Sequence, residues 1–337
     1  MPSYPTRNFR SPAALLRVAA ALAMLPPVAA AQALNDHDNG PLTGIFGFPN
    51  STEGANLASK GRGGWSAAAV TSSHSIVKLT EDEWLKLDGE TTRLSVTYSR
   101  GITERLELGL ELPYVFHESG NLDSIVSGWH ELFGLPTGAR DLLANDLIDF
   151  EYSDRSGAEV DLYRSSNGIG DIRLLGGWRL FGSERSSTAL RFSVKFASGD
   201  SASLHGSGGT DFSIGIAGDH DALWGLQRLN GFYRLSGTHL GEPEFLRERY
   251  RAFVARASGG LGYRLTESME LRAQAALRGS VYDSEINALG TNAVMLSFGA
   301  NFRLSESYRL ALGVAEDVNV STMPDVTFVV TLDYAGN

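Results

Sequence analysis

A two-residue alternation of apolar and polar side chains is the feature that most constrains the fold of this chain. The stretch "RLELGLELPY", residues 105–114, places four leucines on one side of a strand and Glu107 and Glu111 on the other. A soluble sheet would bury the leucines and expose the glutamates to water. A barrel in a membrane would turn the leucines to lipid and the glutamates to its lumen. The rest of the chain distinguishes these two environments.

Similar alternating segments recur from Trp65 onward, and short connections alternate with long ones, as in barrels with tight periplasmic turns and long outer loops. Charges repeat on the face opposite the apolar one, where a dry sandwich core would not tolerate them. We therefore predict an all-β, antiparallel up-and-down transmembrane barrel over residues 64–337. Its twelve predicted strands are 64–77, 91–101, 105–117, 168–181, 188–198, 209–218, 226–238, 250–264, 268–281, 291–304, 307–317 and 324–334.

Residues 1–33 have the three parts of a secretory signal peptide: early arginines, the short apolar run "VAAALAML", and "AQA" as the cleavage site. The apolar run is too short to span a bilayer. Leader and barrel together predict the outer membrane of a Gram-negative bacterium, in contact with its lipid and lipopolysaccharide. Residues 34–63 show no clear period and are predicted to be an irregular segment that stays in the periplasm, plugs the lumen or adds a strand.

Composition excludes several functions. The formal net charge is −10, which disfavours nucleic acid as a partner, and the absence of cysteine excludes disulfides and thiolate metal sites. The histidines are scattered without metal-ligand spacing. We therefore predict neither a metal nor a cofactor.

The polar face of the predicted strands is mainly basic, whereas the connection 118–167 is mainly acidic. This pattern predicts an anion-favouring lumen beneath an acidic mouth. The alternative is that interior Arg and Glu residues pair and fill a narrow barrel. The candidate selectivity residues are Arg93, Arg173, Arg179, Arg191, Lys195, Arg228, Arg234, Arg256, Arg272, Arg278, Glu107 and Glu111.

The long connection 118–167 contains apolar residues at helical spacing, which predict one short helix that Gly134 and Pro136 end. This helix would act as a lid, a plug or an interfacial helix, or would only cap the barrel rim. Its apolar face consists of Leu122, Ile125, Val126, Trp129, Leu132 and Phe133.

Several motifs follow one another along the chain: "GPLTGIFGFPN", "ITERLELGLELPY", "SIVSGWHELFGLP", "NGIGDIRLLGGWRLF", "SGDSASLHGSGGTDFSIG" and "LGVAEDVNVSTMPDVTFVVTL". In this order they resemble a proteobacterial outer-membrane family of the domain-of-unknown-function type. "NGIGD" and "SGDSAS" are also similar to the outer-membrane family associated with phenol-degradation clusters. The resemblance spans about residues 40–334 and implies a β-barrel, but it supplies no catalytic residues.

Together these features favour a passive channel for small anionic or aromatic solutes rather than an enzyme. The first alternative is a closed structural or surface-interaction barrel whose acidic loops bind divalent ions. The second is a membrane-embedded lipid hydrolase, because Ser207, His205 and Asn230 could form a Ser-His-Asn constellation. That arrangement loosely resembles the one in outer-membrane phospholipase A.

Overall fold

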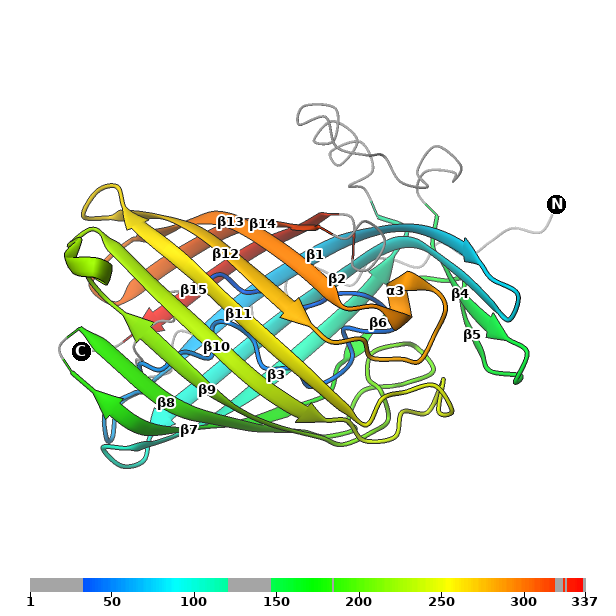
Figure 1. Ribbon diagram of the computed structural model, residues 1–337, viewed down its shortest axis with the longest axis horizontal. Coiled ribbons are helices and arrows are strands. Elements are labelled where there is room, and N and C mark those ends of the chain that lie inside the picture. The colour runs from blue at the N-terminus through cyan, green and yellow to red at the C-terminus, as the bar shows by residue number, and fades with distance from the viewer. Residues whose placement is uncertain (1–32, 121–146, 184, 319–323, 325, 336–337) are drawn as a thin grey trace, which may run out of the picture.

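The computed structural model describes residues 33–120, 147–183, 185–318, 324 and 326–335, which form a closed antiparallel barrel (Figure 1). Twelve strands make the wall, and β1 closes it by pairing with both β2 and β15. The predicted fold class is therefore confirmed. The wall strands are β1 (Gly63–Leu79), β2 (Glu83–Gly101), β3 (Leu106–Glu118), β7 (Arg173–Gly182), β8 (Ser186–Lys195), β9 (Asp211–His220), β10 (Leu229–His239), β11 (Phe253–Arg264), β12 (Met269–Arg278), β13 (Ala293–Arg303), β14 (Tyr308–Asp317) and β15 (Val326–Ala335).

The two ends of the barrel differ in their connections. The turns after β2, β7, β9, β11 and β13 are short and lie at the end where β1 begins and β15 finishes, which we name the short-turn end. The other connections lie at the opposite, long-loop end (Figure 1). The connections within the described residues contain two short helices, η2 (Leu223–Gly225) at the short-turn end and α3 (Asn287–Gly290) at the long-loop end.

The prediction of a long connection over residues 78–90 is wrong. β1 and β2 continue beyond the wall as a hairpin, and β4 (Asp149–Asp154) pairs with β2 there, followed by β5 (Glu159–Leu162). Leu85 and Leu87 alternate onto a buried face that packs with Phe150 and Tyr152, and this burial extends the strands.

The predicted strand 168–181 is interrupted. β3 pairs first with β7 and then with β6 (Ser166–Ile169), and the ladder breaks opposite Pro113, which has no N–H to donate. The predicted loop helix lies within residues 121–146, outside the described residues.

The alternation that opened the sequence analysis points its leucines outward. Leu108 and Leu112 are 44% and 47% exposed, whereas Glu107 and Glu111 are 5% and 9% exposed. Near the short-turn end, Trp65, Tyr308 and Tyr334 cluster on neighbouring strands, as aromatic residues do at a membrane interface. A closed barrel with an apolar outside and a charged inside is an outer-membrane barrel. No helix in the described part of the chain is long and apolar enough to cross a bilayer.

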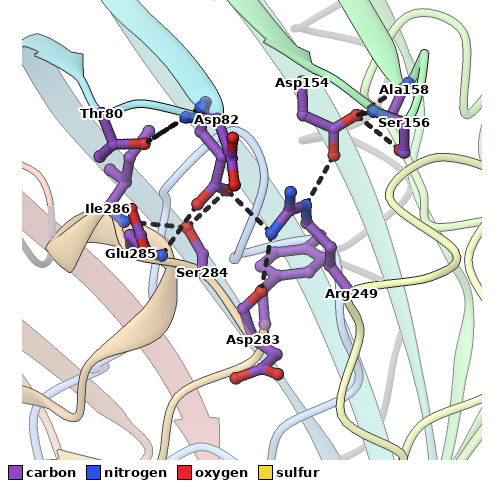
Figure 2. Close-up of polar contacts among 12 residues, drawn as sticks. Thr80, Asp82, Asp154, Ser156, Ala158, Arg249, Asp283, Ser284, Glu285 and Ile286 are labelled. Carbon is purple, nitrogen blue, oxygen red and sulfur yellow. Dashed lines mark hydrogen bonds and ion pairs between the residues drawn. The ribbon is translucent and has the colours of Figure 1, made fainter.

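A compact cap covers the long-loop end. Arg249, in the connection after β10, lies between Asp154 of β4 and the 283–286 segment that precedes α3 (Figure 2). Its Nε lies 2.6 Å from Asp154 Oδ2 and its Nη1 lies 3.7 Å from Glu83 Oε1. Glu83 also accepts hydrogen bonds from the Tyr152 hydroxyl, the Ser284 hydroxyl and the Glu285 amide. Two buried carboxylates, Glu83 of the β1–β2 hairpin and Asp154 of β4, therefore join four connections of the long-loop end.

A charge on the outward face is expected to destabilise the barrel according to its depth in the membrane. Leu312→Arg, in the middle of β14, should lower the free energy of unfolding by about 2–4 kcal/mol, and Leu304→Arg, in the turn after β13, by about 0–1 kcal/mol. Equilibrium unfolding in lipid bilayers measures both values. Equal costs at the two positions would contradict this placement in the membrane.

The cap is expected to titrate at strongly acidic pH. Burial acts to raise the pKa of Asp154, but hydrogen bonds from Ser156, Arg249 and the Ala158 amide outweigh it and lower the pKa to about 2. The stabilisation is thus fully present above the ordinary aspartate pKa and is lost as pH falls toward 2. A carboxyl NMR titration should show this midpoint. Arg249→Gln should raise the midpoint of the Asp154 titration. The control is Arg251→Gln, which should leave this midpoint unchanged because Arg251 pairs with exposed Asp283.

Candidate functional site

Residues 34–62, which we name the plug, run through the inside of the barrel and emerge at the exposed residues 59–62 (dark blue in Figure 1). The Leu34 amide donates to Gln274 Oε1 on β12 at 2.9 Å. The chain then rises toward the long-loop end and returns to the short-turn end, where Lys60 bridges Gly101. The sequence left three locations for this segment: the periplasm, the lumen or an additional strand. The structure places it in the lumen.

A tight turn over residues 38–44 shapes the rising part of the plug. The Gly44 amide donates to the Gly40 carbonyl at 2.7 Å, and Asn39 Nδ2 donates to the carbonyls of Val70 and Thr91 on the wall. A Cβ at Gly44 would lie 2.0 Å from the Asp38 carbonyl oxygen. The turn therefore requires glycine at position 44 because the backbone approaches too closely for any side chain.

The apex of the plug is apolar and joins the cap. Leu42, Ile45, Phe46 and Phe48 are buried in one cluster with residues from the β1–β2 hairpin, β4 and the long loops. The Tyr282 hydroxyl donates to the Leu42 carbonyl at 2.8 Å. The plug apex and the cap thus close the long-loop end of the lumen with a continuous hydrophobic core.

Three acids of the plug each pair with an arginine of the wall. Asp36 lies 2.6 Å from Arg256 on β11, and Asp38 lies 2.9 Å from Arg278 on β12. Glu53 lies 2.8 Å from Arg173 on β7. All six side chains are buried, so each pair compensates charges that would be costly to leave alone away from water.

Wall carboxylates in turn accept backbone N–H groups of the plug. Asp211 accepts from Gly47 at 2.7 Å, Asp219 from Ala55 at 2.6 Å, and Glu107 from Ala58 at 2.7 Å. An irregular buried segment needs such acceptors because it has no ladder of its own. Asp219 and the three plug acids were not singled out from sequence. Asp219 could have been found from its position in the alternation, because it falls on the inward-facing side of β9.

The other candidate lumen residues form pairs on or near the wall. Arg93 and Arg173 both contact Glu111, and Lys195 contacts Asp171 and Asp211. The Arg179 guanidinium donates to the Leu57 carbonyl of the plug. The remaining pairs are Arg191–Glu107, Arg234–Asp219 and Arg272–Glu270.

Arg228 does not face the lumen. It is exposed in the turn between β9 and β10, because β10 begins only at Leu229, three residues later than the predicted strand start. Its side chain therefore projects into solvent at the short-turn end.

A cavity of about 110 Å³ remains between the plug and the wall strands β1, β2, β3 and β7. Its lining is polar and includes Ser95, Thr97 and Asn50 together with the Arg173–Glu53 pair. A smaller cavity of about 20 Å³ lies toward the cap, bordered by Thr91, His117 and His205. Both cavities border His37 and Arg93, which therefore lie between them.

The structure does not assemble Ser207, His205 and Asn230 into a catalytic constellation. Ser207 Oγ contacts Lys195 Nζ, and His205 Nε2 contacts Ser166 Oγ at 3.1 Å. Asn230 lies at the beginning of β10, whereas Ser207 precedes β9 and lies near the end of β10. The full length of the β9–β10 hairpin therefore separates Asn230 from the other two residues.

A family described as "Protein of unknown function (DUF3187)" matches residues 15–335, which confirms the suspected membership of an outer-membrane family of unknown function. No curated protein matches the sequence.

Solved structures similar to this chain include three outer-membrane proteins. The COG4313 outer membrane channel from Pseudomonas putida F1 is 12% identical, with 80% of this chain and 94% of that chain covered and a TM-score of 0.48. The NanC porin is 9% identical, with 81% and 99% covered and a TM-score of 0.44. The CymD monoaromatic hydrocarbon channel is 12% identical, with 94% and 98% covered and a TM-score of 0.39.

The Gly44→Ala substitution is expected to loosen the plug without disturbing the wall. Its methyl group would meet the Asp38 carbonyl, and relieving that overlap should cost about 1–3 kcal/mol. Hydrogen exchange of the plug amides of Gly47 and Ala55 should accelerate. Gly182→Ala, which meets only the Arg179 side chain at 3.6 Å, is the control. If the hydrogen-exchange rates of these amides are unchanged in Gly44→Ala, the turn over residues 38–44 does not hold the plug in place.

Proposed function

The chain belongs to the DUF3187 family, whose function is unknown, and we propose that it is an outer-membrane channel for small polar solutes that its own plug closes at rest. One observation carries this proposal: most of the lumen is filled by an irregular segment, continuous with β1, which contacts the wall only through noncovalent ion pairs, hydrogen bonds and packing. Twelve strands enclose a space wider than the eight-stranded barrels that side chains fill. Moving the plug would therefore empty most of the lumen, and it would also remove the plug apex from the apolar core that closes the long-loop end.

The polar cavity beside the plug supports a route for solutes. It lies on the side of the lumen opposite the β11–β12 wall, and its walls carry hydroxyl, amide and paired charged groups. Such a lining favours polar solutes over aromatic ones. His37 and Arg93 would form the constriction that a solute meets before the cap.

The plug also determines the charge that a solute would meet. While it is in place, the basic groups of the wall are compensated by acids. When it moves, Asp36, Asp38 and Glu53 leave with it, and the wall becomes more basic. Anion preference is thus proposed as a property of the open channel, set by Arg173, Arg256 and Arg278 together with the other arginines of the lumen.

A closed structural barrel is the second candidate, favoured by the hydrophobic core that seals the long-loop end. In that case the outer surface would carry the function. Glu159 and Asp161, which are exposed on the edge strand β5, would then bind divalent ions that bridge to lipopolysaccharide.

Deletion of residues 34–59 is expected to open the channel. The chain from Leu34 should show little conductance in a planar bilayer, whereas the deletion should conduct steadily, with a reversal potential under a salt gradient that indicates anion preference. Adding Arg173→Ser, Arg256→Ser and Arg278→Ser should weaken this preference. Arg303→Ser, at the exposed end of β13, is the control. A correctly folded deletion variant without conductance would favour the closed structural barrel.

A further inference from the structure

Two arginines stand directly opposite each other on the inner wall. Arg256 of β11 and Arg278 of β12 are register partners, and they are only 7% and 3% exposed. Like charges at directly opposed positions of a sheet repel each other, and burial makes the repulsion stronger. Such a pair needs negative charge beside each of the two guanidinium groups.

The plug supplies this negative charge with two aspartates of one short motif. Asp36 and Asp38, two positions apart in "NDHD", contact Arg256 and Arg278 respectively. Arg256 Nη2 also donates to the Asp36 carbonyl at 3.1 Å, and the Arg278 guanidinium lies 5.5 Å from the centre of the Phe48 ring. The motif therefore presents two carboxylates to two adjacent guanidinium groups.

The Asp36–Arg256 and Asp38–Arg278 pairs differ in how many hydrogen bonds support them. Asp36 also accepts from the Ser51 amide and hydroxyl, which fix it within the plug. Asp38 Oδ2 contacts Arg278 Nη2 as an ion pair at 2.9 Å, and in the part of the chain that the structure describes Arg278 Nε has no hydrogen-bond partner. A cavity of about 10 Å³, large enough for about one water molecule, borders Asp36, Asp38 and Arg256. The Arg278 guanidinium is thus less completely hydrogen-bonded by the plug than that of Arg256.

We propose that Arg256 and Arg278 form a binding site for small dicarboxylates, which the Asp36 and Asp38 side chains of the plug occupy in the closed state. A planar guanidinium binds a carboxylate through two parallel hydrogen bonds, so two adjacent arginines match a solute with two carboxylates. A monocarboxylate would replace one aspartate and leave the other in place. The physiological meaning of the site, displacement of the plug by a permeating solute, rests on the proposed channel function.

The plug competes with the solute as a tethered ligand. Because a tethered group acts at an effective concentration on the order of millimolar, a free dicarboxylate must reach similar concentrations to displace it. Removing the two plug carboxylates should therefore raise the apparent affinity for a dicarboxylate, although no contact of the wall has changed.

The first test follows the plug directly with a thiol reporter. The chain has no cysteine, and Thr43, which is buried in the turn next to Asp38, can be replaced as Thr43→Cys. Succinate should raise the rate of maleimide modification of this thiol about tenfold in a saturable manner, whereas acetate at equal ionic strength should have less than about a twofold effect. Arg256→Gln with Arg278→Gln should abolish the succinate response, and Arg303→Gln should preserve it.

The second test measures binding of the solute itself, independently of the thiol reporter. In the chain from Leu34, Asp36→Asn with Asp38→Asn should bind succinate about tenfold more tightly than the same chain without these substitutions in calorimetric titration. Asp38→Asn alone is the milder variant if the double substitution prevents folding. Absence of succinate binding in a folded Asp38→Asn barrel, or an equal response to acetate, overturns the dicarboxylate site. A response to sulfate but not succinate overturns it as well.

These readouts separate the two proposals. Thiol reactivity and calorimetry do not depend on conductance, so a silent plug-deleted barrel would reject the channel and leave the dicarboxylate site standing. If the plug-deleted barrel conducts but its arginine pair binds no succinate, the dicarboxylate site is rejected and the channel stands.

Discussion

The buried ion pairs between the plug and the wall are the interactions on which the rest of the interior depends. Arginines that face inward from neighbouring strands cannot stay uncompensated in a space from which water is largely excluded. Asp36, Asp38 and Glu53 meet this need, and the acids of the wall meet the converse need of the plug backbone for acceptors. Wall and plug are therefore complementary in both charge and hydrogen bonding.

The wall could be predicted from the sequence, because a strand with lipid on one side and a lumen on the other repeats its pattern with period two. All twelve wall strands follow from this pattern, with shifts of a few residues at their ends. The method fails where a strand leaves the membrane. Residues 78–90 look like a loop because their burial comes from β4, a partner that lies more than 60 residues away in the sequence.

The plug could not be derived in the same way. Its residues have no period, since each of its backbone groups finds a different partner on the wall. Asp36 and Asp38 have the appearance of solvated loop acids, and only their position in the lumen makes them partners of Arg256 and Arg278. The sequence thus identified most of the wall arginines correctly as inward-facing, with Arg228 as the exception, but it could not show what compensates them.

The direct connection between the plug and β1 has a consequence for how the protein is assembled. β1 follows the plug without a linker and forms the seam with β15 that closes the barrel. The plug apex packs into the apolar core of the cap, and the end of the plug that joins β1 lies at the short-turn end. The segment that fills the lumen is therefore attached to the wall at the seam itself. Filling and closure of the barrel are thereby coupled through β1, which the plug precedes and which β15 must meet to complete the wall.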